Sequence, residues 1–252
     1  PWKDRARAEQ QDARAMKLRF ERRKPRHTLL SICYRLAKLP FASARGKMRF
    51  YLDLNWIGWR LAIEQAERMY GFGESSMRRK NLEFLLARMQ SGARVLDLGC
   101  KYGEISAIVA EKAERVIAVD HDPQALEKAR AAHPATNLEF IHADAFDVLE
   151  KETAPVDLVI LSHILEHLEK PEAMLARLKA HATHCYIELP DLDASYLNHY
   201  RQLAGARLQY TDNDHIWEFD RDSLLEVIEG AGWKILDSEY RYGVQKHWCG
   251  RA

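Results

Sequence analysis

The chain has 252 residues, of which 47% are hydrophobic, and its 38 basic and 37 acidic side chains give a formal net charge of +1. This length and composition suit one α/β domain with an appendage and exclude a disordered chain. No apolar run approaches the roughly 18 residues that span a bilayer, and four scattered cysteines form no CxxC pair, so we expect no membrane helix, signal peptide, zinc ribbon or disulfide framework.

The first 90 residues are basic, with 21 Lys and Arg against 9 Asp and Glu, whereas the remainder is acidic. Proline, glycine and serine positions predict helices within this basic part. The predicted helices cover 1–24, ended by Pro25; about Lys47 to Tyr70; and Ser75 or Ser76 to about Met89. Between the first two lies a short apolar stretch with basic flanks, 28–39, ended by Pro40. We therefore predict a basic helical extension over 1–90 and a second domain over 91–252.

From residue 95 onward, strand and helix patterns alternate, which is typical of a mostly parallel, doubly wound sheet with ligands at the strand carboxyl ends. The predicted strands are 95–98, 115–120, 138–143, 156–162, 184–189, 233–240 and 244–248. The predicted helices begin near Ile105, Pro123, Pro171 and Ser223. A short turn at Gly243 predicts that the last two strands pair antiparallel.

The stretch VLDLGCKYGEIS, residues 95–106, combines a buried strand, a tight turn and a helix start. Gly99 and Gly103 flank the turn, with Lys101 between them. This geometry holds a small ligand against backbone N–H groups. A dinucleotide-binding turn normally has the pattern GxGxxG, and its third glycine is missing here, which disfavours a nicotinamide cofactor.

This segment resembles motif I of class I S-adenosylmethionine-dependent methyltransferases, usually (V/I)LDxGxGxG, in which the middle glycine varies most. Three further segments occur in the family's order, VIAVDHDP, FIHADAFD and VDLVILSHILEHLEKPEAML, and GWKIL is similar to the entry to the family's sixth strand. The resemblance covers roughly residues 80–250. It implies a Rossmann-like seven-stranded α/β sheet with an antiparallel last strand, S-adenosylmethionine as cofactor and S-adenosylhomocysteine as product.

The same resemblance assigns the cofactor site. Asp120 ends the second strand, where a carboxylate can accept hydrogen bonds from both ribose hydroxyls, and Asp144 and Ala145 would face the adenine. Plainer interpretations stay open: Asp120 could cap a helix, Asp144 could be a turn residue, and Lys101 could be a solvated charge or a cation beside the cofactor carboxylate. The predicted cofactor-binding residues are Asp97, Gly99, Cys100, Lys101, Gly103, Asp120, His121, Asp144, Ala145 and Ser162.

Methyl transfer from a sulfonium is an in-line displacement, and an alcohol acceptor also needs a base, for which histidine is suited near neutral pH. His163 and His167 follow the fourth strand and, four residues apart, would share one face of a helical turn. His215 precedes the last helix, where related methyltransferases often place a histidine in the acceptor pocket. These three are the catalytic candidates, although local packing remains the alternative for His167 and a loop position for His215. No third metal ligand is fixed by the sequence, so no metal is expected.

The polar and aromatic insertion at about 190–219 suits a hydroxylated acceptor such as a sugar. Its aromatic residues form either a lid over the acceptor or ordinary core; they are Tyr196, Tyr200, Tyr210, Trp217 and Phe219. The basic extension could cap the cofactor site, lie on an anionic membrane surface or bind a partner protein, and nucleic acid is the least favoured ligand. We expect a cytoplasmic protein, with peripheral attachment to the inner membrane face left open.

Together these features predict an enzyme that O-methylates a sugar or glycan-like acceptor, as in bacterial surface polysaccharide biosynthesis. Three alternatives remain at the level of the sequence. They are a methyltransferase of another small molecule, lipid or RNA; a methyltransferase-like domain that binds without catalysis; and an NAD-dependent oxidoreductase.

Overall fold

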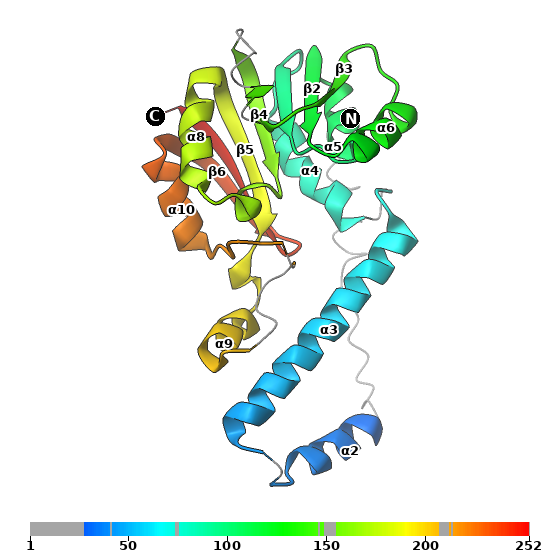
Figure 1. Cartoon of the computed structure of the whole chain (residues 1–252), viewed down its shortest axis with the longest axis vertical. Coiled ribbons are helices and arrows are strands. Elements are labelled where there is room, and N and C mark those ends of the chain that lie inside the picture. The colour runs from blue at the N-terminus through cyan, green and yellow to red at the C-terminus, as the bar shows by residue number, and fades with distance from the viewer. Residues whose placement is uncertain are drawn as a thin grey trace, which may run out of the picture. The chain divides into compact units, whose positions relative to one another are not determined.

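The computed structural model (Figure 1) describes residues 28–40, 42–73, 76–145, 147–148, 155–206, 212 and 214–251. The chain divides into two compact units, Pro1–Lys47 and Met48–Ala252. The helix predicted over 1–24 and the predicted acceptor residue Tyr210 lie outside the described residues. Within the described ranges, no helix is both long enough and apolar enough to cross a membrane.

The N-terminal helices are α2 (Thr28–Ala37), α3 (Ala44–Tyr70) and α4 (Met77–Arg88). Helix α3 begins three residues before the predicted start, because the Ser43 hydroxyl accepts a hydrogen bond from the Gly46 N–H and so caps it earlier. Ser76 occupies the N-cap of α4 as predicted, but its side chain makes no capping hydrogen bond. The division at residue 90 stays a prediction.

The second unit contains a seven-stranded sheet in the order β3-β2-β1-β4-β5-β7-β6. Neighbouring strands from β3 to β5 run parallel, and β7 lies antiparallel between β5 and β6. The predicted parallel sheet with an antiparallel end is therefore confirmed. The strands are β1 (Arg94–Leu98), β2 (Arg115–Asp120), β3 (Leu138–His142), β4 (Val156–Ser162), β5 (Ala182–Pro190), β6 (Trp233–Arg241) and β7 (Val244–Arg251).

Helices cover both faces of the sheet (Figure 1). They are α5 (Glu104–Ala110), α6 (Pro123–Ala132), α8 (Pro171–His181) and α10 (Arg221–Gly230), with the short 3₁₀ helices η1 (Leu165–His167) and η2 (Leu192–Ala194) and helix α9 (Tyr196–Ala204) near the carboxyl ends of β4 and β5. The central strand β4 explains the two layers, because Leu158 and Ile160 pack with α4 and α6 whereas Val159 and Leu161 pack with α8 and α10. A strand buried on both faces has a nearly continuous apolar sequence, and β4 was predicted as a strand on that ground.

The β5–β7 pair places two thiols opposite each other, Cys185 and Cys249, and both are fully buried and reduced. Every described residue of β7 from Val244 to Gly250 is buried, including the polar run Gln245, Lys246 and His247. The buried charge of Lys246 is paired, because its Nζ donates to Glu239 Oε1 at 2.5 Å and to Asn81 Oδ1 at 3.0 Å. This pairing ties α4 to the last two strands.

Candidate active site

The turn after β1 is held in a left-handed backbone conformation at three positions. Gly99, Lys101 and Gly103 have φ angles of 76°, 48° and 77°. A Cβ on Gly99 would lie 2.0 Å from the Ile164 side chain, and one on Gly103 would lie 2.7 Å from the Phe140 ring. The positive φ angles and the close side chains favour glycine at these two positions, and Ile164, which follows β4, packs against the turn.

Asp97 lies beneath the turn in β1 and is 2% exposed. Burial raises the pKa of its carboxyl to about 7, the hydrogen bond from the Ser106 hydroxyl (2.5 Å) lowers it, and the nearby charge of Asp120 raises it again. A carboxyl that titrates near neutral pH beside the predicted cofactor turn is typical of a functional site.

Asp120 ends β2 and holds the turn from the other side. Its Oδ2 accepts a hydrogen bond from the Lys101 N–H at 2.7 Å, and its Oδ1 accepts one from the Asp122 N–H at 2.9 Å. The helix cap is instead Asp122, whose side chain accepts hydrogen bonds from the first turn of α6. Asp120 therefore orders the strand-end loops, and it does not cap α6.

The remaining predicted cofactor residues lie along the same strand ends. Cys100 is buried within the turn, Ser162 ends β4, and Asp144 and Ala145 follow β3. The His121 side chain is 91% exposed, with Nδ1 at 3.6 Å from Asp120 Oδ1. The ammonium groups of Lys101 and Lys128 both lie near the Tyr102 ring, at 5.7 and 5.6 Å from its centroid. Their roles toward a cofactor stay predictions.

His163 follows β4 in a left-handed conformation, with φ at 56°. Its Nδ1 lies 3.1 Å from Glu166 Oε1, and its Nε2 lies 3.7 Å from Glu188 Oε1. Burial by itself would lower the pKa of the imidazole, but the Glu166 hydrogen bond and the charges of Glu166 and Glu188 outweigh it, so the pKa is raised. The side chain is still 42% exposed, so a substrate can reach it.

Two residues of this site were missed by the sequence reasoning, Glu188 and Tyr186 of β5. The Tyr186 hydroxyl donates to Glu188 Oε2 at 2.5 Å, and both side chains are buried. They stand two positions apart and so face the same side of the strand. A glutamate inside the apolar run CYIEL was the available signal, because a buried carboxylate needs a partner.

The prediction that His163 and His167 share a helical face is wrong. His163 has a left-handed backbone and the 3₁₀ helix η1 begins only at Leu165, so the two residues do not share a helical turn. His167 instead packs edge-on against His215, with ring centroids 4.7 Å apart. Burial lowers the pKa of His215, but the Glu218 hydrogen bond and the charges of Glu166, Glu218 and Asp212 raise it overall. The site thus brings all three predicted histidines to the end of β4, as two groups.

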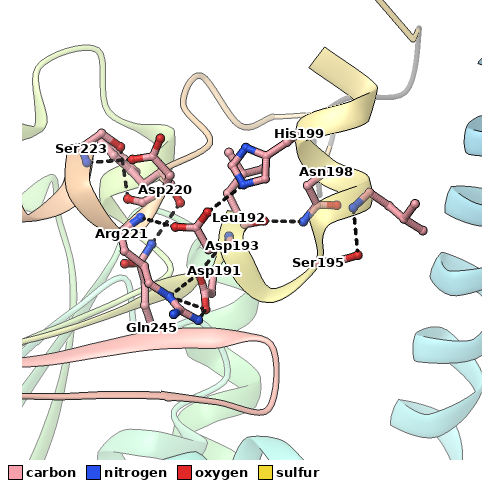
Figure 2. A network of polar contacts seen from close by, with 12 residues as sticks. Asp191, Leu192, Asp193, Ser195, Asn198, His199, Asp220, Arg221, Ser223 and Gln245 are labelled. Carbon is pink, nitrogen blue, oxygen red and sulfur yellow. Dashed lines mark hydrogen bonds and ion pairs between the residues drawn. The ribbon is translucent and has the colours of Figure 1, made fainter. Parts of the chain in front are cut away.

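The insertion after β5 is fastened at its base, as Figure 2 shows. Arg221 at the start of α10 makes hydrogen bonds with both carboxylate oxygens of the buried Asp191, the shortest at 2.7 Å. Its backbone N–H donates to Asp193 Oδ2 at 3.0 Å, while Asp193 Oδ1 lies 2.7 Å from His199 Nε2. These contacts join the end of β5 to both α9 and α10, so they fix where the insertion leaves the sheet.

The insertion contains a helix that the sequence reasoning did not predict, α9, although both of its ends carry ordinary signals. The Ser195 hydroxyl accepts the Leu197 N–H, and Gly205 ends the helix with φ at 65°. Two of its aromatic residues, Tyr196 and Tyr200, are exposed, whereas Phe219 belongs to the core. Within the second unit, α9 contacts α3 through Arg201 Nη2 and Asn55 Oδ1 at 2.7 Å.

The sheet order, the glycine turn after β1 and the acid that ends β2 define the fold of class I methyltransferases. The family model of the methyltransferase domain matches residues 71–238. The chain therefore belongs to this family, whose cofactor is S-adenosylmethionine.

Individual relatives agree with this assignment. The chain is 31% identical over 127 residues to the tRNA 5-carboxymethoxyuridine methyltransferase of Escherichia coli K12, covering 47% of this chain and 49% of that protein. It is 31% identical over 97 residues to a ubiquinone biosynthesis O-methyltransferase of Xylella fastidiosa M23, covering 37% and 39%. The matches thus span about half or less of these relatives' lengths.

Among solved structures, magnesium protoporphyrin IX methyltransferase from Synechocystis PCC 6803, crystallised with S-adenosylhomocysteine, matches with a TM-score of 0.54 and 17% identity. The match covers 76% of this chain and 95% of that one. At this identity the likeness shows the fold alone.

Proposed function

We propose that this chain transfers the methyl group of S-adenosylmethionine to a hydroxyl oxygen of a small, sugar-like acceptor, with His163 as the general base. In this step the carbon–sulfur bond breaks, the carbon–oxygen bond forms, the acceptor proton passes to His163, and S-adenosylhomocysteine leaves. The observation that carries the proposal is the placement of His163: its neighbour Ile164 packs against Gly99 of the cofactor turn.

The contacts of His163 suit a base. Glu166 orients the imidazole through Nδ1, which fixes the tautomer, while Glu188 adds a second negative charge beside the ring. Both carboxylates stabilise the imidazolium that forms when the proton arrives. Tyr186 in turn holds Glu188 in place.

The acceptor class is supported by exposed aromatic side chains in the insertion after β5. Tyr196, Tyr200 and Trp217 are 71%, 44% and 45% exposed, and flat aromatic faces beside polar groups suit the alternating C–H and O–H surfaces of a sugar. One relative is named for O-methylation and another for methylation of tRNA. A different small molecule, a lipid or RNA are therefore the outcomes to be tested against a sugar. The oxidoreductase alternative is not retained, because the family is that of methyltransferases.

For the basic N-terminal part we propose an anionic surface, such as a membrane, as the partner. On α2, the apolar residues Ile32 and Tyr34 are 49% and 64% exposed, next to the basic residues Arg35 and Lys38. Exposed apolar and cationic side chains on one short helix suit attachment to the headgroup region.

The cofactor assignment is tested by calorimetry with S-adenosylhomocysteine. Asp120→Ala should weaken binding at least tenfold, about 1.4 kcal/mol, because it removes the proposed ribose acceptor and frees the Lys101 N–H. The exposed Glu139→Gln is the control and should bind as wild type does. Unchanged affinity in Asp120→Ala would refute the ribose assignment, and no binding by the wild type would favour a domain without catalysis.

The base is tested with His163→Asn, since asparagine tolerates the left-handed backbone. We expect kcat to fall about 100-fold while cofactor affinity stays the same, which is the usual contribution of a general base. Tyr242→Asn makes the same kind of replacement at another left-handed position and should leave kcat unchanged. Labelled cofactor with separated glycan, lipid and RNA fractions then identifies the acceptor, and labelling of RNA alone would exclude a sugar.

A further inference from the structure

A second cluster lies next to His163 on the acceptor side of the site. Glu166, His167 and His215 each offer one ligand atom, and these atoms all lie within 4.8 Å of one another. The side chains of Glu166 and His215 are buried, at 1% and 5% exposure, whereas His167 is 32% exposed. It joins η1 to the segment before α10, two parts of the chain that are far apart in sequence.

One oxygen of the Glu166 carboxylate has no hydrogen-bond donor among the described residues. Its Oε1 lies against His163, but its Oε2 is buried and receives no hydrogen bond from the described residues. A buried carboxylate oxygen without a donor is unfavourable, and such an atom in a folded protein calls for a missing ion or water. This unpartnered oxygen is independent of the spacing of the three side chains and points to a cation.

The two histidines are oriented as metal ligands usually are. His167 Nδ1 lies 3.2 Å from the Asp214 carbonyl oxygen, and His215 Nδ1 lies 3.1 Å from Glu218 Oε1. A metal-bound imidazole normally gives its other N–H to a carbonyl or carboxylate, which fixes its tautomer.

The backbone holds the two parts of the cluster together before any ion arrives. The N–H groups of Ile216 and Trp217 donate to the Glu166 carbonyl oxygen at 2.8 and 3.1 Å. The Trp217 indole N–H also donates to the Leu168 carbonyl oxygen at 2.9 Å. A preorganised site of this kind binds an ion without reordering the chain.

We propose that Glu166, His167 and His215 bind one divalent transition-metal ion. Two imidazoles and one carboxylate favour Zn²⁺, Mn²⁺, Fe²⁺ or Co²⁺ over Mg²⁺ and Ca²⁺, which prefer oxygen ligands. Three protein ligands leave a coordination position open. An acceptor hydroxyl suits that position beside His163; this last point rests on the proposed methyl transfer, whereas the metal site does not.

The test uses the full chain, stripped with a chelator and titrated calorimetrically with ZnCl₂, MnCl₂, CoCl₂ and MgCl₂. We expect one transition ion per chain, bound at least 100-fold more tightly than Mg²⁺, and a visible Co²⁺ absorption spectrum typical of nitrogen and oxygen ligands. His215→Ala should weaken binding at least 100-fold. His199→Ala is the matched control, because His199 lies in the same insertion but pairs with Asp193 outside the cluster.

His167→Ala is a second variant for the case that His215→Ala does not fold, because His167 is the more exposed of the two histidines at 32%. Unchanged ion affinity in a folded His167→Ala or His215→Ala variant would overturn the site, as would weak binding of every ion by the wild type. Cofactor affinity measured on the same stripped protein separates the two proposals. Metal binding without methyl transfer would contradict only the proposed function, and transfer without metal binding would contradict only the metal site.

Discussion

Lys101 adopts the left-handed backbone conformation that the family's pattern usually gives to glycine. For a residue with a Cβ this conformation costs about 1–2 kcal/mol. Two hydrogen bonds offset this cost. The Lys101 N–H donates to Asp120, and the Gly99 N–H donates to the Val119 carbonyl oxygen. The lysine is thus retained at some expense in stability, which suggests a role for its side chain.

Comparison of Lys101→Gly with Lys101→Ala separates backbone from side chain. Both variants remove the ammonium group, but only glycine relieves the left-handed strain, so Lys101→Gly should be about 1 kcal/mol more stable than Lys101→Ala in urea unfolding. Equal stabilities would show that the turn carries no strain at Lys101. If the ammonium group contacts the cofactor carboxylate, both variants should lose cofactor affinity to the same extent.

Asp97 makes the free energy of unfolding depend on pH. Its pKa is about 7 in the folded protein against 3.8 as the ordinary value, so the folded chain keeps a proton that the unfolded chain loses. The stabilisation of the folded chain that comes from this retained proton is complete below pH 3.8 and is lost as the pH rises through 7.

Asp97→Asn should abolish this dependence. The stability of the wild type relative to the variant should fall between pH 5 and 7, by up to about 1.4 kcal/mol per pH unit. Urea unfolding followed by circular dichroism measures the difference, and the exposed Glu226→Gln serves as control. A difference that stays constant with pH would show that Asp97 is ionised throughout.

At the scale of elements, the salt bridge of Asp191 and Arg221 fixes the base of the insertion, which contains α9 and His215. Asp191 is 2% exposed and Arg221 38% exposed, so the pair is only partly shielded from water. Removing one partner leaves a buried charge unpaired, whereas removing both does not.

A double-mutant cycle with Asp191→Asn and Arg221→Ala should therefore give a coupling energy of about 1–2 kcal/mol, less than for a fully buried pair. The exposed pair Arg115 and Glu139, at 48% and 53% exposure, is the control and should give at most about 1 kcal/mol. Coupling of the Asp191 pair no larger than that of the control would mean that other contacts in Figure 2 hold the insertion.

The sequence predicted the elements whose periodicity is set locally and missed the features set by contacts between them. The apolar run of β4, the start of α6 at Pro123 and the tight turn at Gly99 could be predicted, because each depends on neighbours in the chain. The position of His163 outside the helical turn of His167 could not be predicted, because it depends on a left-handed backbone at a residue that is not glycine. Glu188 was overlooked because its partners, His163 and Tyr186, become apparent only when β4 and β5 lie side by side.

At the scale of the whole molecule, the charge is divided along the chain, with 21 basic and 9 acidic residues in the first 90. In the second unit, helix α3 also carries exposed apolar residues, since Phe50, Leu54 and Trp59 are 58%, 55% and 45% exposed. Trp59 is therefore not a core residue of the described structure. An anionic surface complements the charge and the apolar residues together.

The full chain should bind vesicles that contain anionic lipid, and binding should weaken as salt is added. Arg35→Glu with Lys38→Glu should reduce partitioning more than about tenfold, because each charge contributes about 1 kcal/mol near the surface. Lys128→Glu with Lys234→Glu changes the same charge elsewhere and is the matched control. Equal binding to neutral vesicles, or equal loss in the control, would contradict the proposed surface.

The four cysteines lie in different structural settings, which gives the protein internal reporters of local opening. Cys33 on α2 is exposed, whereas Cys100, Cys185 and Cys249 are buried, and burial raises the thiol pKa of all three, that of Cys249 to about 12. Alkylation requires the thiolate, so the buried cysteines react only when their surroundings open. A brief pulse of alkylating reagent would thus mark Cys33 at once, Cys100 when the cofactor turn loosens, and the opposed pair in β5 and β7 only when the sheet itself separates.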